Sequence, residues 1–127
     1  MDITPLIPTG RQIIESYGAG RFRVSGAAYG SSIIVFPERT IPWEAASAAQ
    51  ITLDSLDEIA RAGAAGRVDV LLIGCGERMV LIPAALRRAL RDAGIVIEPM
   101  DTGAACRTYN VLLLDGRQVA AALIPID

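Results

Sequence analysis

The hydrophobic and polar positions of this chain follow two different periods. In the first forty residues, segment 21–25 alternates polar and apolar residues, which is typical of a half-buried strand, and segment 31–36 is rich in β-branched and aromatic residues. Both segments lie among closely spaced glycines at Gly18, Gly20, Gly26 and Gly30. We therefore predict short antiparallel strands in the N-terminal half, with Trp43 folded back over this small sheet.

After Thr52 the pattern alternates between helical and extended segments. Helical spacing covers 52–62, 83–93 and 104–113; Gly63 and Gly66 are expected to end the first helix, and Asp101 or Thr102 to cap the last. Apolar runs predict strands at 68–73, 95–97 and 118–124.

Strands joined by helices make right-handed crossovers, which predicts a largely parallel pair at the centre of the sheet. The predicted fold class is α/β. We expect one domain over residues 1–127, with N-terminal antiparallel β-strands followed by βαβα units.

Parallel pairing would bring two polar segments together. If the strands beginning at Val68 and Ile95 are parallel, their C-terminal ends lie at one edge of the sheet. The Gly74-Cys75-Gly76 loop and segment 101–110 would then lie side by side, at the edge where open α/β sheets tend to bind ligands.

The most polar stretch of this edge is open to two interpretations; it consists of Arg107, Thr108, Tyr109 and Asn110. In the functional interpretation these residues form an anion- or peptide-recognition patch, with Arg107 as the charge and N–H groups of the helix start assisting. In the structural interpretation Tyr109 packs inward with its hydroxyl bonded and Asn110 ties down a neighbouring loop. Arg107 would then pair with a carboxylate such as Asp101 or Glu98.

The Gly74-Cys75-Gly76 loop resembles a nucleotide-binding loop only weakly. A dinucleotide fingerprint needs a third glycine where this chain has Met79, and Pro83 places the next helix several residues too late. A tight turn explains the two glycines. Arg78 would favour a Cys75 thiolate, but free cysteines are more often buried and inert, and the same holds for Cys106.

Composition narrows the chemistry. The chain has no His, and all twelve of its basic residues are Arg, so the usual neutral-pH base, His-containing metal sites and Schiff-base lysines are excluded. A net charge of −2 without a basic run argues against nucleic acid as a partner. A carboxylate pair among Glu77, Glu98 and Asp101 has no motif behind it. The Arg87, Arg88 and Arg91 face is typical of a solvated helix surface. We expect no catalytic residue, metal or cofactor.

Features of the chain ends predict a cytoplasmic protein. Asp2, Pro5 and Pro8 argue against a signal peptide, and the longest apolar run, 119–126, is too short for a transmembrane segment. A Cys75–Cys106 disulfide is not expected in that compartment.

Three segments together resemble one small α/β family: the Gly74-Cys75-Gly76 loop, residues 98–112 and residues 116–125. Its animal members include a mitochondrial respiratory complex I assembly factor and an adipogenesis-associated protein, and its bacterial members are mostly uncharacterised. The resemblance implies a three-layer fold around a mixed sheet, without an established catalytic activity or cofactor. It also implies a protein partner, such as a respiratory-complex subunit or another assembly factor.

The leading hypothesis is therefore a non-enzymatic interaction protein that resembles the assembly factors of complex I, the NADH:ubiquinone oxidoreductase. Its binding residues would be Gly74, Cys75, Gly76, Arg107, Thr108, Tyr109 and Asn110. The alternative is a small-molecule or anion-binding protein, or an enzyme, with a pocket at the glycine loop and Arg107. In a third interpretation the polar residues only stabilise a crowded corner. The apolar sheet and helix faces leave room for a homodimer.

Overall fold

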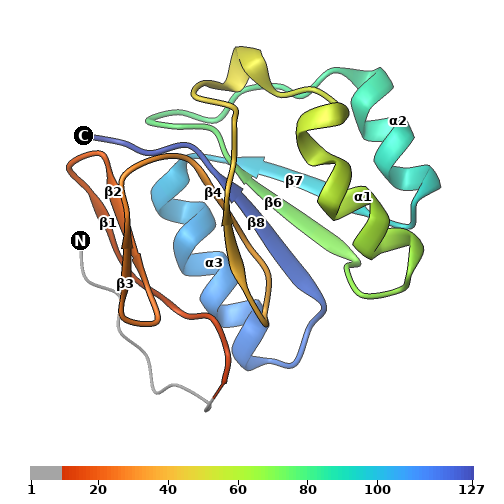
Figure 1. The fold of residues 1–127 in the computed structure, drawn as a ribbon. Helices are drawn as coiled ribbons and strands as arrows, with labels where there is room; N and C mark the ends of the chain where they lie inside the picture. The colour runs from red at the N-terminus through yellow and green to blue at the C-terminus, as the bar shows by residue number, and fades with distance from the viewer. Residues whose placement is uncertain (1–9) are drawn as a thin grey trace.

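The N-terminal strands form a small sheet of their own. A computed structural model describes residues 10–127 (Figure 1), so the signal-peptide prediction, which rests on Asp2 to Pro8, lies outside the described residues. Strands β1 (Ile14–Gly18), β2 (Arg21–Val24) and β3 (Ala27–Tyr29) are antiparallel, in the order β1-β2-β3. Ala19-Gly20 and Ser25-Gly26 join them, and φ is positive at all four residues, as the tight hairpin turns of twisted strands require.

The larger sheet has five strands in the order β5-β4-β8-β6-β7. They are β4 (Ile33–Val35), β5 (Thr40–Pro42), β6 (Val70–Gly74), β7 (Val96–Met100) and β8 (Val119–Leu123). Strand β6 is parallel to both β7 and β8, whereas β4 is antiparallel to β5 and β8. The predicted central parallel pairing and mixed sheet are confirmed.

Three α-helices connect these strands: α1 (Asp57–Ala64), α2 (Ala84–Asp92) and α3 (Thr102–Leu114). Two short 3-10 turns, Ala48–Gln50 and Asp54–Leu56, precede α1. The prediction that Gly63 ends α1 is wrong, because the helix runs through it to Ala64. A Cβ at Gly63 would lie 2.4 Å from Ile95 Cδ1 and 2.8 Å from the Ala93 carbonyl oxygen, so its glycine permits close packing. Gly66, with φ +74°, follows the end of the helix.

Helices cover both faces of the five-stranded sheet. One hydrophobic core lies between the sheet and α1 and α2, and includes Leu56, Ile59 and Leu90. The other surrounds α3, which lies between the five-stranded sheet and the β1–β3 sheet (Figure 1). The three predicted layers are present, and the small sheet covers the outer side of α3.

Trp43 does not pack where the sequence suggested. We expected it over the small N-terminal sheet, but it belongs to the core on the α1–α2 face, where its indole Nε1 donates to the Ser55 carbonyl at 2.8 Å. The reason is that the β4–β5 hairpin pairs with β8 and joins the larger sheet, which carries the following residue to the other face.

Candidate functional site at the carboxyl edge of the sheet

We expected the glycine loop to lie beside residues 101–110, and the structure confirms this for the start of α3. Tyr109 and Asn110, further along the helix, bond to Gln12 and Ile14 at the start of β1 instead. Thr102, the first residue of α3, is fully buried, and its backbone N–H donates to the Gly76 carbonyl at 2.9 Å. Its hydroxyl accepts the Gly76 N–H at 2.9 Å and donates to the Ile124 carbonyl at 2.6 Å. One side chain therefore joins the ends of β6 and β8 to α3, and we call this junction the rim.

The rim is too crowded to leave an open cleft between its parts. A Cβ at Gly74 would lie 2.9 Å from Leu123 Cδ2 and 3.0 Å from Thr102 Cα, so only glycine fits there without a shift. Asp101 is the helix cap, since its carboxylate accepts the Ala104 N–H at 2.9 Å. That result resolves the choice between Asp101 and Thr102. The role of Thr102 as a junction had no signal in the sequence beyond its place at a helix start.

Tyr109 and Asn110 are buried and bonded within the molecule. The Asn110 amide accepts the Ile14 N–H at 3.0 Å and donates to the Ile14 carbonyl at 2.8 Å, so it pairs with strand β1 as a neighbouring strand would. The Tyr109 hydroxyl donates to the Gln12 carbonyl at 3.0 Å. Burial raises the pKa of Tyr109 well above its ordinary value, and Glu38 adds to this rise. Both side chains are therefore bonded within the molecule, as the structural interpretation predicts.

Arg107 is the exposed member of the predicted patch, and Thr108 is half-buried. The Arg107 guanidinium donates to the Tyr17 hydroxyl rather than to either predicted carboxylate. Tyr17 packs on the first turn of α3, where a Cβ at Gly103 would lie 2.9 Å from its hydroxyl oxygen. Arg107 is thus held against β1 while its side chain remains accessible.

The two cysteines lie in separate cores. Both thiols are free and buried, Cys75 on the α1–α2 face and Cys106 on the α3 face. The sheet therefore separates them. Burial raises the pKa of Cys106 to about 12, against a smaller lowering effect of Arg107, so its thiol stays protonated at neutral pH. The Cys75 sulfur lies 3.7 Å from the Ile73 carbonyl oxygen and 3.8 Å from that of Val80.

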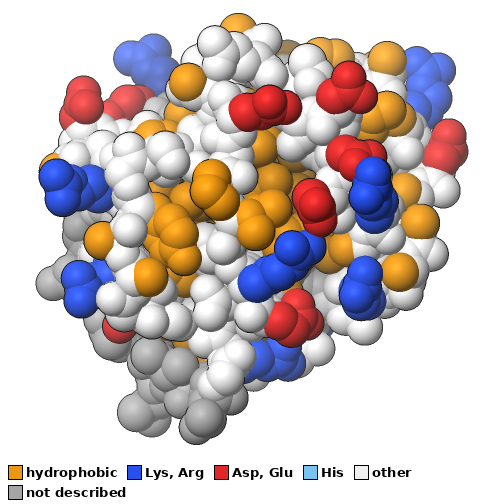
Figure 2. Space-filling model, in the orientation of Figure 1, with side chains coloured by type: hydrophobic (Ala, Val, Ile, Leu, Met, Phe, Trp, Pro, Cys, Tyr) orange, Lys and Arg blue, Asp and Glu red, His pale blue; other side chains and the backbone are white. Residues whose placement is uncertain are grey.

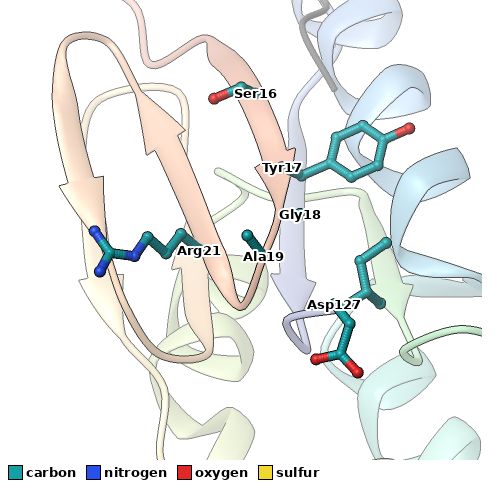
Figure 3. A pocket seen from close by; sticks show the side chains of 7 residues that line it. Ser16, Tyr17, Gly18, Ala19, Arg21 and Asp127 are labelled. Carbon is teal, nitrogen blue, oxygen red and sulfur yellow. The ribbon is translucent and has the colours of Figure 1, made fainter.

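A hollow of about 490 Å³ lies beside the β1–β2 turn and the C-terminal segment. Figure 3 shows that Tyr17 points toward α3 and that the Arg21 side chain points away from the other lining residues. Cys75 and Arg107 do not line it. Because the polar groups that residues 10–127 contribute to this hollow do not converge, they do not form the arrangement that orients a small ligand.

An apolar segment is exposed after the glycine loop. Met79, Val80 and Leu81, which connect β6 to α2, are 53%, 42% and 80% exposed. We call these three residues the apolar loop. Because the loop follows Gly76, it starts at the rim.

The described part of the chain offers neither a cluster of metal-binding side chains nor a membrane-spanning helix. Residues 10–127 contain no group of three or more His, Cys, Asp or Glu side chains that could hold a metal ion. No helix within the same range has both the length and the apolar character needed to cross a membrane.

Fold and rim together define a small α/β domain with a mixed sheet and a closed carboxyl edge. The chain belongs to the DUF498/DUF598 family, which is described as a protein family of unknown function, through a match to residues 14–124. The resemblance noted from the sequence is thereby confirmed at the level of the family.

The chain is similar to an uncharacterized protein, to an assembly factor and to a structure described as an outer membrane protein. An uncharacterized protein of Rhodobacter capsulatus is 39% identical over 114 residues, covering 89% of this chain and 84% of that protein. The NADH dehydrogenase [ubiquinone] 1 alpha subcomplex assembly factor 3 of Xenopus tropicalis is 31% identical over 88% of this chain. The match spans only 60% of that assembly factor. A structure described as an outer membrane protein from Bartonella henselae superposes with a TM-score of 0.85 at 34% identity, covering 93% of this chain and 98% of that one.

Proposed function

We propose that this protein is a non-enzymatic interaction protein that assists the assembly of respiratory complex I by binding a partner protein. The observation that carries the proposal is the relationship to an assembly factor over 88% of the chain. Proposed partners are a complex I subunit or another assembly factor. A cytoplasmic location belongs to the same proposal, and fractionation of the host cell tests it.

The bonding of the rim and of α3 supports recognition of a protein surface over binding of a small molecule. Thr102, Tyr109 and Asn110 are buried and direct polar groups to backbone atoms of their own chain, so they are poorly placed to contact a ligand. Arg107 and the apolar loop are accessible instead. A run of three exposed apolar residues is uncommon on a surface without a binding role.

The outer edges of the five-stranded sheet are poorly suited to pairing with a strand of a partner. In β7 the Val96 N–H donates to the Asp69 carbonyl, on the side of β6. Because successive residues of a strand direct their backbone groups to opposite sides, those of Ile97 and Pro99 face away from β6. Pro99 has no N–H, and the Ile97 carbonyl accepts from Arg87 at 3.3 Å.

The opposite edge strand, β5, has the same protection. The Trp43 N–H donates to the Ser32 carbonyl, so the backbone of the preceding residue, Pro42, faces away from β4. Pro42 has no N–H to offer to a strand of a partner. The proposed contact is therefore made by side chains, with the apolar loop as its centre and Arg107 as its charge.

Gene deletion and complementation test the proposal. Deletion in the native host is expected to lower the amount of assembled complex I and its NADH oxidation activity, and wild-type protein to restore both. A Met79→Gln/Leu81→Gln variant should fail to restore them and should lose the partner in affinity purification, because polar side chains weaken an apolar contact. Arg107→Ala is expected to weaken the same purification.

Val96→Thr is the matched control. Val96 is 53% exposed, as Met79 is, but it lies at the opposite end of the parallel strands. This variant should restore assembly fully. Normal complex I in the deletion strain would overturn the respiratory role, and full function of the Met79→Gln/Leu81→Gln variant would overturn the proposed contact surface.

A further inference from the structure

Three arginines that are remote in sequence meet at the amino edge of the sheet, opposite the rim. Arg11, Arg67 and Arg117 each precede a strand, and all three line one hollow of about 270 Å³. Within residues 10–127, Glu38 is the one carboxylate that also lines it, together with Pro37, Gly116 and Gln118. We call this place the arginine hollow.

Backbone hydrogen bonds hold these segments together. The Gln12 N–H donates to the Pro37 carbonyl at 2.9 Å, which places the residues beside Arg11 and Glu38 against each other. The Asp69 N–H donates to the Gln118 carbonyl at 2.8 Å, which does the same for the segments of Arg67 and Arg117. The backbone positions of the three arginines are therefore fixed by the fold, although their side chains extend to the surface.

The charges of the arginine hollow are not balanced by the residues that the structure describes. A second hollow, of about 390 Å³, shares Glu38 and Arg67 with the first. There Arg39 pairs with Glu58 and Arg61 with Asp57, each at 2.9 Å. Figure 2 shows acidic and basic side chains interspersed in this way over the α1 side of the molecule.

The three arginines of the first hollow differ from these pairs. Among residues 10–127, none of Arg11, Arg67 and Arg117 has a carboxylate oxygen within 4.0 Å. Asp69 and Asp115 are near these arginines along the chain but do not line the hollow. The described residues thus place three guanidinium groups and one carboxylate around this hollow, a net positive site that an anion would stabilise.

Helix ends account for part of this arrangement. Arg67 and Arg117 follow the terminal glycines of α1 and α3, and their N–H groups bond back to Ala62 at 2.8 Å and Leu112 at 2.9 Å. Cations are favoured at helix C-termini. However, α2 ends with the same bond pattern, from the Ile95 N–H to Leu90, so the motif does not require arginine. The helix-end motif also does not explain why Arg11 lies beside Arg67 and Arg117.

We propose that the arginine hollow binds a small, multiply charged oxyanion of the phosphate type. The planar guanidinium fork matches two oxygens of a phosphate group at once, and its charge does not titrate near neutral pH. Two or three such groups can contact a pyrophosphate from different sides. This site is distinct from the rim and does not depend on the assembly role.

Calorimetric titration with inorganic pyrophosphate tests the proposal, with inorganic phosphate as a second probe. We expect pyrophosphate to bind the wild-type protein more tightly than phosphate does, because it carries more charge. Arg67→Ala and Arg117→Ala should each weaken binding about tenfold or more, the usual effect of losing a charge-assisted hydrogen bond. Arg67→Lys, which keeps the charge but loses the fork, should weaken it less.

Arg78→Ala removes the same charge from an exposed position after the glycine loop, at the opposite end of the parallel strands, and is the matched control. It should leave pyrophosphate binding unchanged, and so should Leu81→Gln in the apolar loop. The proposal is overturned if pyrophosphate gives no heat of binding and no rise in melting temperature at millimolar concentration. It is equally overturned if Arg78→Ala weakens binding as much as Arg67→Ala, since the effect would then be one of overall charge.

Discussion

The polar side chains of α3 and the arginines of the arginine hollow differ in how they are bonded. At the rim and along α3, Thr102, Tyr109 and Asn110 bond to backbone groups inside the molecule. At the amino edge, Arg67 and Arg117 are exposed, and neither is ion-paired with any residue in the range 10–127. A dense polar stretch in a sequence can thus serve packing, whereas scattered cations can meet in a site.

Replacing Asn110 by Leu should break the interior side of this comparison most strongly. The change leaves the buried N–H and carbonyl of Ile14 without partners, which is expected to cost about 2–4 kcal/mol of unfolding free energy. Urea denaturation followed by circular dichroism measures the loss. Thr108→Ala, at the half-buried neighbouring position, should change stability by less than about 1 kcal/mol. Wild-type stability of the Asn110→Leu variant would contradict an interior role for this amide.

A pH series sharpens the same comparison through Cys106. Burial raises the pKa of its thiol from 9.0 to about 12, so the folded protein holds this proton more tightly than the unfolded chain. Stability from this group is therefore complete below about pH 9 and is lost as the pH rises toward 12. Between pH 8 and pH 10 the expected loss is about 1 kcal/mol.

Urea midpoints at pH 8 and pH 10 measure this effect, with Cys106→Ala as the reference. The reference should lose less stability over the same interval, because the residue that replaces Cys106 cannot ionise. Equal losses in the two proteins would mean that the Cys106 thiol is not held protonated by the fold.

The smallest expected effect concerns the amino edge. Arg117→Ala should change unfolding free energy by less than about 0.5 kcal/mol, because this exposed side chain has no ion-pair partner among residues 10–127. Thermal denaturation in buffer without phosphate measures it. A loss of 2 kcal/mol or more, as for a buried group, would show that the arginine serves packing, and the contrast with the side chains of α3 would disappear.

Local patterns in the sequence predicted most of the elements and the meeting of the glycine loop with α3. Parallel pairing of β6 and β7 requires their C-terminal ends to share an edge, so the rim could be inferred from two apolar runs. The position of Trp43 could not, because alternation along a strand does not say which sheet that strand joins. The role of Gly63 inside α1 could not be predicted either, because its close approach to Ile95 is a tertiary contact.

The two candidate sites also differ in how much of each could be predicted from the sequence. Arg107 to Asn110 stood out because they are consecutive, yet the sequence could not decide which of them faces β1. Arg11, Arg67 and Arg117 are separated by about fifty residues each, and only the pairing of distant strands brings them to one hollow.

The position of β8 has a consequence for synthesis of the chain. This strand lies between β4 and β6, yet it follows every other described strand in sequence. During translation, the hairpin of β4 and β5 therefore leaves the ribosome long before the strand that connects it to β6 and β7. Until then both halves expose unpaired backbone groups, a condition that favours aggregation or capture by a chaperone.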